Sequence, residues 1–150
     1  MDMDKIDFVV SGREVNIFIN GRNLIDMIRE IELPFATAEG YACIAGGYVG
    51  LPKSVALPPS QQLLGKPDED FSSNGGRTCL LVCSACGESI CWPLQANIIV
   101  TDTEIIWTDF SQPYRARKDQ KSIWSYKGFG PFHFSKQQYL KALNSESSLN

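Results

Sequence analysis

The sequence predicts an α+β domain in which an antiparallel sheet is packed by two amphipathic helices. Apolar residues alternate near the N-terminus, as in a β-hairpin, and three apolar strands follow one another after residue 77. Two further segments place apolar residues at helical spacing. We therefore expect an N-terminal hairpin and a C-terminal three-stranded meander in one sheet, within a single domain of residues 1–150.

The hairpin is predicted by residues 7–21, DFVVSGREVNIFING, with its turn at the Ser-Gly pair. In the second strand Val15, Ile17 and Ile19 alternate with the residues between them, which is the period of a strand with one buried face. These three side chains should therefore face the core.

The first helix is predicted by residues 22–34, RNLIDMIREIELP. Asn23 is placed to act as its N-cap, and Asp26 in the first turn favours the helix dipole. Pro34 should end the helix, because the residue before a proline avoids helical backbone angles. The apolar stripe that should pack on the sheet consists of Leu24, Ile25, Met27, Ile28 and Ile31.

The stretch from about residue 52 to 77 is rich in proline and glycine and predicts a long irregular surface loop. Only Gln61–Leu64 favours a short helical turn. Long loops inside a compact domain are often functional. Just upstream, Gly46-Gly47 lacks the lysine spacing of a P-loop, so it predicts a strand or turn and no phosphate site.

The meander is predicted at residues 78–84, 91–101 and 103–110, with a turn at Thr101-Asp102. The connection between its first two strands contains Gly87, which we expect to supply the positive φ that the reversal needs. Because the strands are thickly apolar, helices should cover one face of the sheet.

A final helix should follow Ser135, which forms an S-x-x-Q capping box with Gln138. Phe134 is spaced to pack on Tyr139 as a hydrophobic staple at the start of this helix. From about residue 144 the polar tail should fray.

Charge and hydropathy restrict the location and the partners. Residues 1–110 carry 7 basic and 15 acidic residues, whereas residues 111–150 carry 7 and 2, which gives the chain a net charge of -3. A nucleic-acid-binding domain would show a larger basic footprint, so we expect no nucleic-acid partner. No apolar run approaches the ~20 residues that span a bilayer, and the N-terminus lacks a secretory pattern. The prediction is a cytoplasmic protein with no membrane partner.

The densest chemistry lies in CSACGESICW, residues 83–92, which holds Cys83, Cys86 and Cys91. In a reducing compartment the five cysteines should be free thiols or metal ligands. A structural zinc site needs four ligands, and His133, the chain's one histidine, is the remaining candidate. Without it, the segment is a packed sheet corner, since free cysteine is often buried. No other cofactor is indicated.

Redox and nucleophilic catalysis are less favoured by the sequence. A thioredoxin-type CxxC motif depends on a helix that begins at the motif, whereas a turn and a strand follow here. Any cysteine or serine nucleophile would depend on His133. Carboxylates in or near the meander could supply acid–base pairs, but nothing in the sequence indicates that two of them converge. They are Glu88, Asp102, Glu104 and Asp109.

Aromatic residues gather toward the end of the chain, where the segment from Trp92 to Tyr139 holds 10 of the 16. Most should be core, because each can bury roughly 150–250 Å². Aromatic residues beside arginine are also typical of protein interfaces. We therefore expect a protein-binding surface at the Trp107–Arg115 strand end and the basic loop 115–121. Its candidate residues are Trp107, Phe110, Tyr114, Arg115, Arg117 and Lys118.

Three segments carry a resemblance to a family of small uncharacterised bacterial proteins. They are LLVCSACGESICWPLQANIIV, IIWTDFSQPYR and GFGPFHFSKQQYLKAL. In this order they are similar to the family's C-G-E turn followed by C-W-P-L, its W-x-x-F-x-Q-P-x-R strand, and its G-P-F-x-F segment with a closing helix. The resemblance covers about the last half of the chain and implies no activity. The family pattern has one residue between the first two cysteines of the turn, whereas two separate Cys83 from Cys86 here.

Three functions follow as hypotheses. The leading one is a non-enzymatic accessory domain that binds a protein partner; a toxin-neutralising role would suit its size and acidity, and a homo-oligomer is compatible with it. The second is a small zinc-binding domain. The third is an enzyme with a cleft under the 52–77 loop, which would need His133 or a carboxylate pair inside that cleft.

Overall fold

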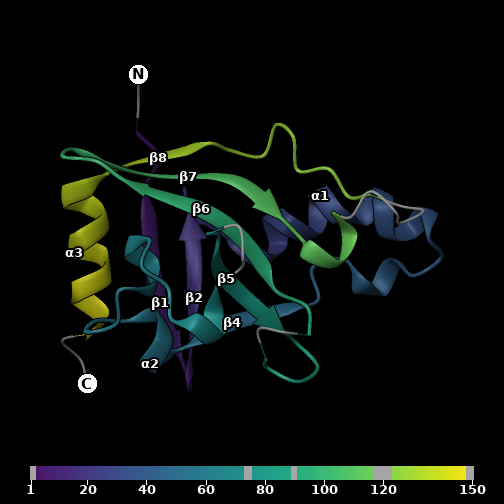
Figure 1. Cartoon of the computed structure of the whole chain (residues 1–150), viewed down its shortest axis with the longest axis horizontal. Helices are drawn as coiled ribbons and strands as arrows, with labels where there is room; N and C mark the ends of the chain where they lie inside the picture. The colour runs from purple at the N-terminus through teal and green to yellow at the C-terminus, as the bar shows by residue number, and fades with distance from the viewer. Residues whose placement is uncertain (1–2, 73–75, 89–90, 117–122, 148–150) are drawn as a thin grey trace.

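The predicted fold class is confirmed by a computed structural model, which describes residues 3–72, 76–88, 91–116 and 123–147. Eight strands form an antiparallel sheet, and helices pack on it (Figure 1). The strands are β1 (Ile6–Ser11), β2 (Glu14–Ile19), β3 (Arg22–Asn23), β4 (Tyr48–Pro52), β5 (Thr78–Cys83), β6 (Leu94–Val100), β7 (Glu104–Ser111) and β8 (Phe132–Ser135). The helices are α1 (Leu24–Ala38), α2 (Lys53–Ala56) and α3 (Lys136–Ser147), with short 3-10 turns η1 (Ala42–Ile44), η2 (Gln62–Leu64), η3 (Glu69–Phe71) and η4 (Pro113–Arg115).

The sheet follows the order β1-β2-β4-β5-β6-β7-β8, with β3 paired to β2. Its two edges meet, because the segment just before β1 forms a bridge to β8. The backbone N–H of Asp4 donates to the carbonyl of His133 at 2.8 Å, and the N–H of His133 donates to Oδ2 of Asp4 at 2.9 Å. The predicted hairpin and meander therefore form the two halves of one sheet that curls back on itself.

Helix α3 lies along β1 (Figure 1). Ser135 caps α3 by accepting from the N–H of Gln138 at 3.3 Å, as expected. The Gln138 side chain does not return to the cap, because it bonds both backbone groups of Ile6, at 3.1 and 2.6 Å. It thereby covers the edge of β1. The helix continues to Ser147, past the position where we expected fraying. No helix in the described ranges combines the length and apolar character needed to cross a membrane.

Helix α1 begins as predicted and ends later than predicted. The Asn23 side chain accepts from the N–H of Ile25, which is the expected N-cap. The prediction that Pro34 ends the helix was wrong, because the helix runs through it to Ala38. Pro34 has no backbone N–H to donate to the helix, and burial of helix residues after it offsets this lost hydrogen bond. The true end is a Schellman motif, in which Gly40 has a φ of 84° and Tyr41 N–H donates to Ala36 at 3.0 Å.

The stretch from 52 to 77 is more ordered than a surface loop where it is described, because α2, η2 and η3 lie within it. Gln62 is wholly buried and fastens the stretch to the sheet. Its side-chain amide donates to the carbonyls of Phe71 and Cys79, and its Oε1 accepts from the N–H of Asp68.

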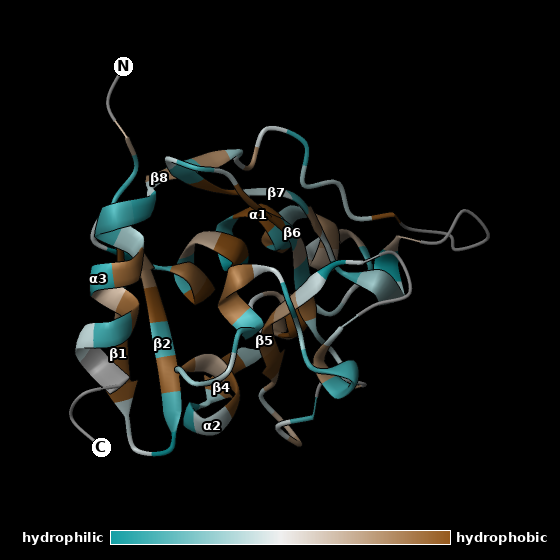
Figure 2. Cartoon of the chain, turned by 60° about the vertical axis from the view of Figure 1, so that its left-hand side comes forward, coloured by the Kyte–Doolittle hydropathy of each residue, from teal (hydrophilic) through white to brown (hydrophobic). Residues whose placement is uncertain are grey.

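The core lies between the curled sheet and its helices. In Figure 2 the hydrophobic colour is concentrated in the strands and in the helices that face them. Tyr139 of α3 stands at the centre, in ring contact with Phe8, Trp107 and Phe134. The contact with Phe134 is the expected staple. Tyr139 accepts a hydrogen bond from the Trp107 indole at 3.2 Å and donates to the Leu63 carbonyl at 2.5 Å. Each polar group of this aromatic centre is therefore paired.

A buried carboxylate on α1, that of Glu32, connects three separate parts of the chain. Glu32 is wholly inaccessible to solvent. It accepts hydrogen bonds from the N–H of Gly46 at 2.8 Å, the hydroxyl of Tyr48 at 2.5 Å and the hydroxyl of Tyr126 at 2.6 Å. Gly46 has a φ of 65°, and a Cβ there would lie 2.7 Å from Cβ of Arg29, so only glycine fits this turn.

Burial raises the pKa of Glu32 above 4.5, and hydrogen bonds from Tyr126, Tyr48 and Gly46 limit the rise. The folded protein thus holds the Glu32 proton more tightly than the unfolded chain. The stability that this group contributes is complete below pH 4.5 and is lost as the pH rises through the raised pKa.

We expect wild-type protein to lose free energy of unfolding relative to Glu32→Gln as the pH rises from 4.5, because glutamine does not titrate. Urea unfolding of both proteins between pH 4 and 8 measures the difference in their free energies of unfolding. If the free energies of unfolding of the two proteins changed in parallel with pH, Glu32 would have the same pKa in the folded and unfolded protein, and the prediction would fail. Glu32→Ala should lose on the order of 3 kcal/mol, because it leaves three buried donors without their acceptor.

Candidate functional site

The cysteine hairpin, residues 83–92, connects β5 to β6. Two backbone hydrogen bonds shape the described part of it. The N–H of Gly87 donates to the carbonyl of Cys83 at 2.8 Å, and Gly87 has the predicted positive φ, at 71°. The N–H of Ser84 donates to the carbonyl of Gly47 at 3.0 Å, which fixes the base of the hairpin to the turn that Glu32 holds.

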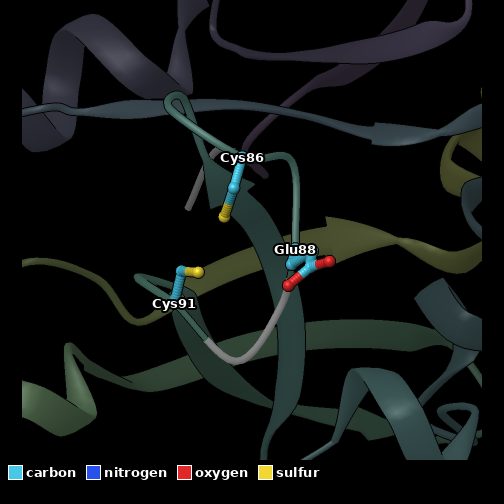
Figure 3. Close-up of side chains that lie close together, drawn as sticks. All are labelled: Cys86, Glu88 and Cys91. Atoms are coloured by element: carbon cyan, nitrogen blue, oxygen red, sulfur yellow. The ribbon is translucent and has the colours of Figure 1, made fainter.

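Three metal-ligating groups converge on this hairpin: Cys86, Glu88 and Cys91. The two sulfurs and a carboxylate oxygen of Glu88 all lie within 4.8 Å of one another, and all three residues are exposed. Figure 3 shows the sulfur atoms of Cys86 and Cys91 pointing toward one another, with Glu88 beside them. Cys83 is half-buried and lies outside this group of three, and its thiol makes a smaller contribution to lowering the pKa of Cys86.

The thiols of Cys86 and Cys91 lie close enough to change one another's pKa. Donation from Cys91 lowers the pKa of Cys86, with a further contribution from the backbone of Glu88. The same hydrogen bond raises the pKa of Cys91 to about 11.

A hollow of about 390 Å³ opens beside the hairpin. It brings Cys43 of η1 to the same end of the molecule as the hairpin cysteines, although η1 is remote in the sequence. The fifth cysteine, Cys79, is buried in β5, where desolvation raises the pKa of its thiol to about 12. The hollow is lined by Cys43, Ile44, Gly47, Cys83, Ser84, Ala85, Cys91, Trp92 and Arg115.

Arg115 forms one wall of the hollow and is held from three sides. Its guanidinium lies 5.0 Å from the Trp92 ring centroid and 5.5 Å from that of Trp124. Nε of Arg115 donates to both carboxylate oxygens of Glu39, at 3.2 and 3.1 Å. The Trp124 indole donates to the same carboxylate at 2.6 Å. Nε1 of Trp92 is buried with no hydrogen-bond partner in the part of the chain that the structure describes.

The expected fourth metal ligand, His133, does not join the cysteines. It lies in β8, which is three strand positions from β5 in the sheet. Its Nδ1 is 3.1 Å from a carboxylate oxygen of Glu104. The ligand group found among the described residues contains no histidine. Because β8 is paired along β7, its backbone is not available to fold over the hairpin.

The expected partner-binding surface also requires correction. Trp107 is wholly buried and Phe110 nearly so, because both point into the core from β7. Tyr114 is exposed, and Arg115 is largely enclosed by the hollow's wall. Arg117 and Lys118 lie outside the described residues.

The four acids that could have supplied acid–base pairs lie in separate places. Glu88 lies on the cysteine hairpin, and Asp102 in the turn between β6 and β7. Glu104 pairs with His133, and Asp109 pairs with Arg77 at 2.7 Å. In the described residues, Glu104 and Asp109 therefore each face a basic partner and not another acid.

Comparison of the chain with protein-family models, with curated proteins and with solved structures found no match in any of the three. The resemblance to a bacterial family noted from the sequence motifs is therefore still an expectation.

Glu88 was predicted from the sequence only as a possible acid–base group, and Cys43 was not placed at this end of the molecule. Glu88 stands between Cys86 and Cys91, so the motif Cys-x-Glu-x-x-Cys was a readable signal for a mixed thiol and carboxylate ligand set. Cys43 carries no such signal, because only the tertiary fold brings η1 beside the hairpin.

Proposed function

We propose that the protein is a zinc-binding domain whose cysteine hairpin holds Zn²⁺ through Cys83, Cys86, Cys91 and the carboxylate of Glu88. The observation that carries the proposal is the convergence of three ligand atoms within 4.8 Å on one short connection. This ligand set replaces the histidine of the sequence hypothesis with a neighbouring carboxylate.

The exposure of these cysteines supports a chemical role. Free cysteine is among the most frequently buried residue types, and Cys79 follows that rule. Cys86 and Cys91 are exposed to solvent, so core packing gives no reason for a thiol at either position. Two thiols that turn toward one another and toward a carboxylate are what a metal site requires.

The donor set also selects the class of metal. Thiolates favour Zn²⁺ and Cu⁺, whereas Mg²⁺ and Ca²⁺ take oxygen ligands. A carboxylate together with thiolates suits Zn²⁺, which binds both and is usually tetrahedral. The site lies at the surface, and the domain has its own aromatic core around Tyr139. Zinc would therefore order the hairpin without being required for folding.

We expect the reduced protein to bind one Zn²⁺ per chain, and Cys86→Ser and Cys91→Ser to weaken the affinity at least about tenfold each, because each loses a thiolate ligand. Competition titration with a chromophoric chelator measures both quantities. Cys43→Ser is the matched control, since that thiol is exposed at the same end but outside the group.

His133→Asn separates this ligand set from the one predicted by the sequence and should bind zinc like wild type. Less than about 0.2 zinc per chain, or unchanged affinity in the Cys86 and Cys91 variants, would overturn the proposal.

A second candidate function is the docking of a protein partner at the same end of the molecule, and one observation favours it. Glu39 hydrogen-bonds to Arg115 and to Trp124. Each of these three residues has a large exposed hydrophobic side chain one or two positions away in the sequence. The large exposed side chains are Tyr41, at 63%, Ile123, at 49%, and Tyr114, at 42%. Aromatic residues beside an arginine are typical of interface hot spots.

We expect a photo-cross-linking residue at position 41 or at position 114 to capture the same protein in cells, because both positions lie at this end. Mass spectrometry of the adducts identifies the partner. Position 9 is the control, since Val9 is as exposed as Tyr114 and lies on β1, away from the C-terminal end of α1 (Figure 1). The same adduct at position 9, or different adducts at 41 and 114, would contradict a docking surface here.

A further inference from the structure

The exposed thiol pair of the hairpin has a second chemistry besides metal binding. The sulfurs of Cys86 and Cys91 lie within 4.8 Å of one another, and Figure 3 shows them turned toward each other. A disulfide needs the two sulfurs about 2.05 Å apart. Rotation of two solvent-exposed side chains can cover much of the remaining gap, since such rotations are fast and little hindered.

We propose that Cys86 and Cys91 form a reversible disulfide with low-molecular-weight disulfides of the glutathione class, and that this reaction controls the metal site. The inference deepens the proposed function, because both use the same two thiols. It stands on their geometry and exposure, so disulfide formation can be tested in the absence of metal.

The reaction balances with the external disulfide as the oxidant. One thiolate of the pair attacks a sulfur of the external disulfide, whose S–S bond breaks while a mixed disulfide forms and one external thiolate leaves. The second thiolate of the pair then attacks the protein sulfur of the mixed disulfide and expels the other external thiolate. Two electrons pass from the protein to the external disulfide. The products are one protein disulfide and two external thiols.

The other cysteines are placed less favourably for this reaction. Cys79 is wholly buried in β5, so an external disulfide cannot reach it. Cys83 is half-buried and its backbone is fixed by the pairing of β5 with Tyr48 of β4. Cys43 is exposed, but it lies in η1 and outside the close group. Of the cysteines, only Cys86 and Cys91 are both exposed and in close mutual contact.

Oxidation would remove two of the proposed ligands in one step. A disulfide sulfur is no longer a thiolate, and the thiolate is the form that binds metal. Cys83 and Glu88 alone are too few for a structural zinc site. Zinc and the disulfide should therefore exclude one another on this hairpin.

The test uses full-length protein stripped of metal by a chelator and then incubated with glutathione disulfide. Iodoacetamide blocks the remaining thiols, and peptide mass spectrometry locates the bonds. We expect a Cys86–Cys91 disulfide, with two glutathione molecules released per chain. Cys91→Ser should stop at a mixed disulfide between Cys86 and glutathione, and Cys43→Ser should behave like wild type. No protein disulfide, or one that joins Cys83 or Cys43 instead, would overturn the inference.

A second arm separates this inference from the zinc proposal. Protein loaded with one Zn²⁺ should release it to a chromophoric chelator in step with disulfide formation, and reduction should restore binding. If the chain binds no zinc but the disulfide forms in the metal-free protein, the zinc proposal fails and the inference of a reversible Cys86–Cys91 disulfide is supported. If zinc binds but no Cys86–Cys91 disulfide forms, the inference fails and the zinc proposal stands.

Discussion

The carboxylate of Glu32 is the interaction on which the site end of the molecule depends. It is buried, and its three hydrogen-bond donors are uncharged groups from two segments, Gly46 and Tyr48 in one and Tyr126 in the other. One of them, the N–H of Gly46, fixes the turn whose next carbonyl, that of Gly47, accepts from Ser84 at the base of the cysteine hairpin. A single acid on α1 thus sets the position of a hairpin about fifty residues away.

Glu39, the C-cap residue of α1, has a similar role two turns later. Glu39 follows Glu32 by seven residues, a spacing that returns to the same side of a helix. Its hydrogen bonds to Arg115 and Trp124 position the Arg115 side of the hollow. Glu32 in the same way positions Gly46, next to Gly47 in the hollow's lining. The cost of burying these acids is offset only if their donors stay in place. The site is therefore built on a rigid frame, while Cys86, Glu88 and Cys91 project from it into solvent.

Local patterns explain what could be predicted from the sequence. The alternation of Val15, Ile17 and Ile19, the Asn23 cap and the positive φ of Gly87 depend on near neighbours in the chain. Contacts between distant segments were not predictable. The Gln138 side chain bonds the edge of β1 and not the helix cap. Glu32 accepts a hydrogen bond from Tyr126, which is remote in the sequence. His133 was assigned to the cysteines because it was the one histidine, whereas the pairing of β8 with β7 gives it Glu104 instead.

The central claim is that sulfur and carboxylate ligands of one hairpin, and no histidine, bind zinc. X-ray absorption spectroscopy at the zinc edge of protein loaded with one equivalent tests it most directly, because sulfur, oxygen and imidazole scatter differently. The account predicts a shell of three sulfurs at about 2.3 Å and one oxygen at about 2.0–2.2 Å. A shell without sulfur, or the outer scattering pattern of imidazole, would contradict it.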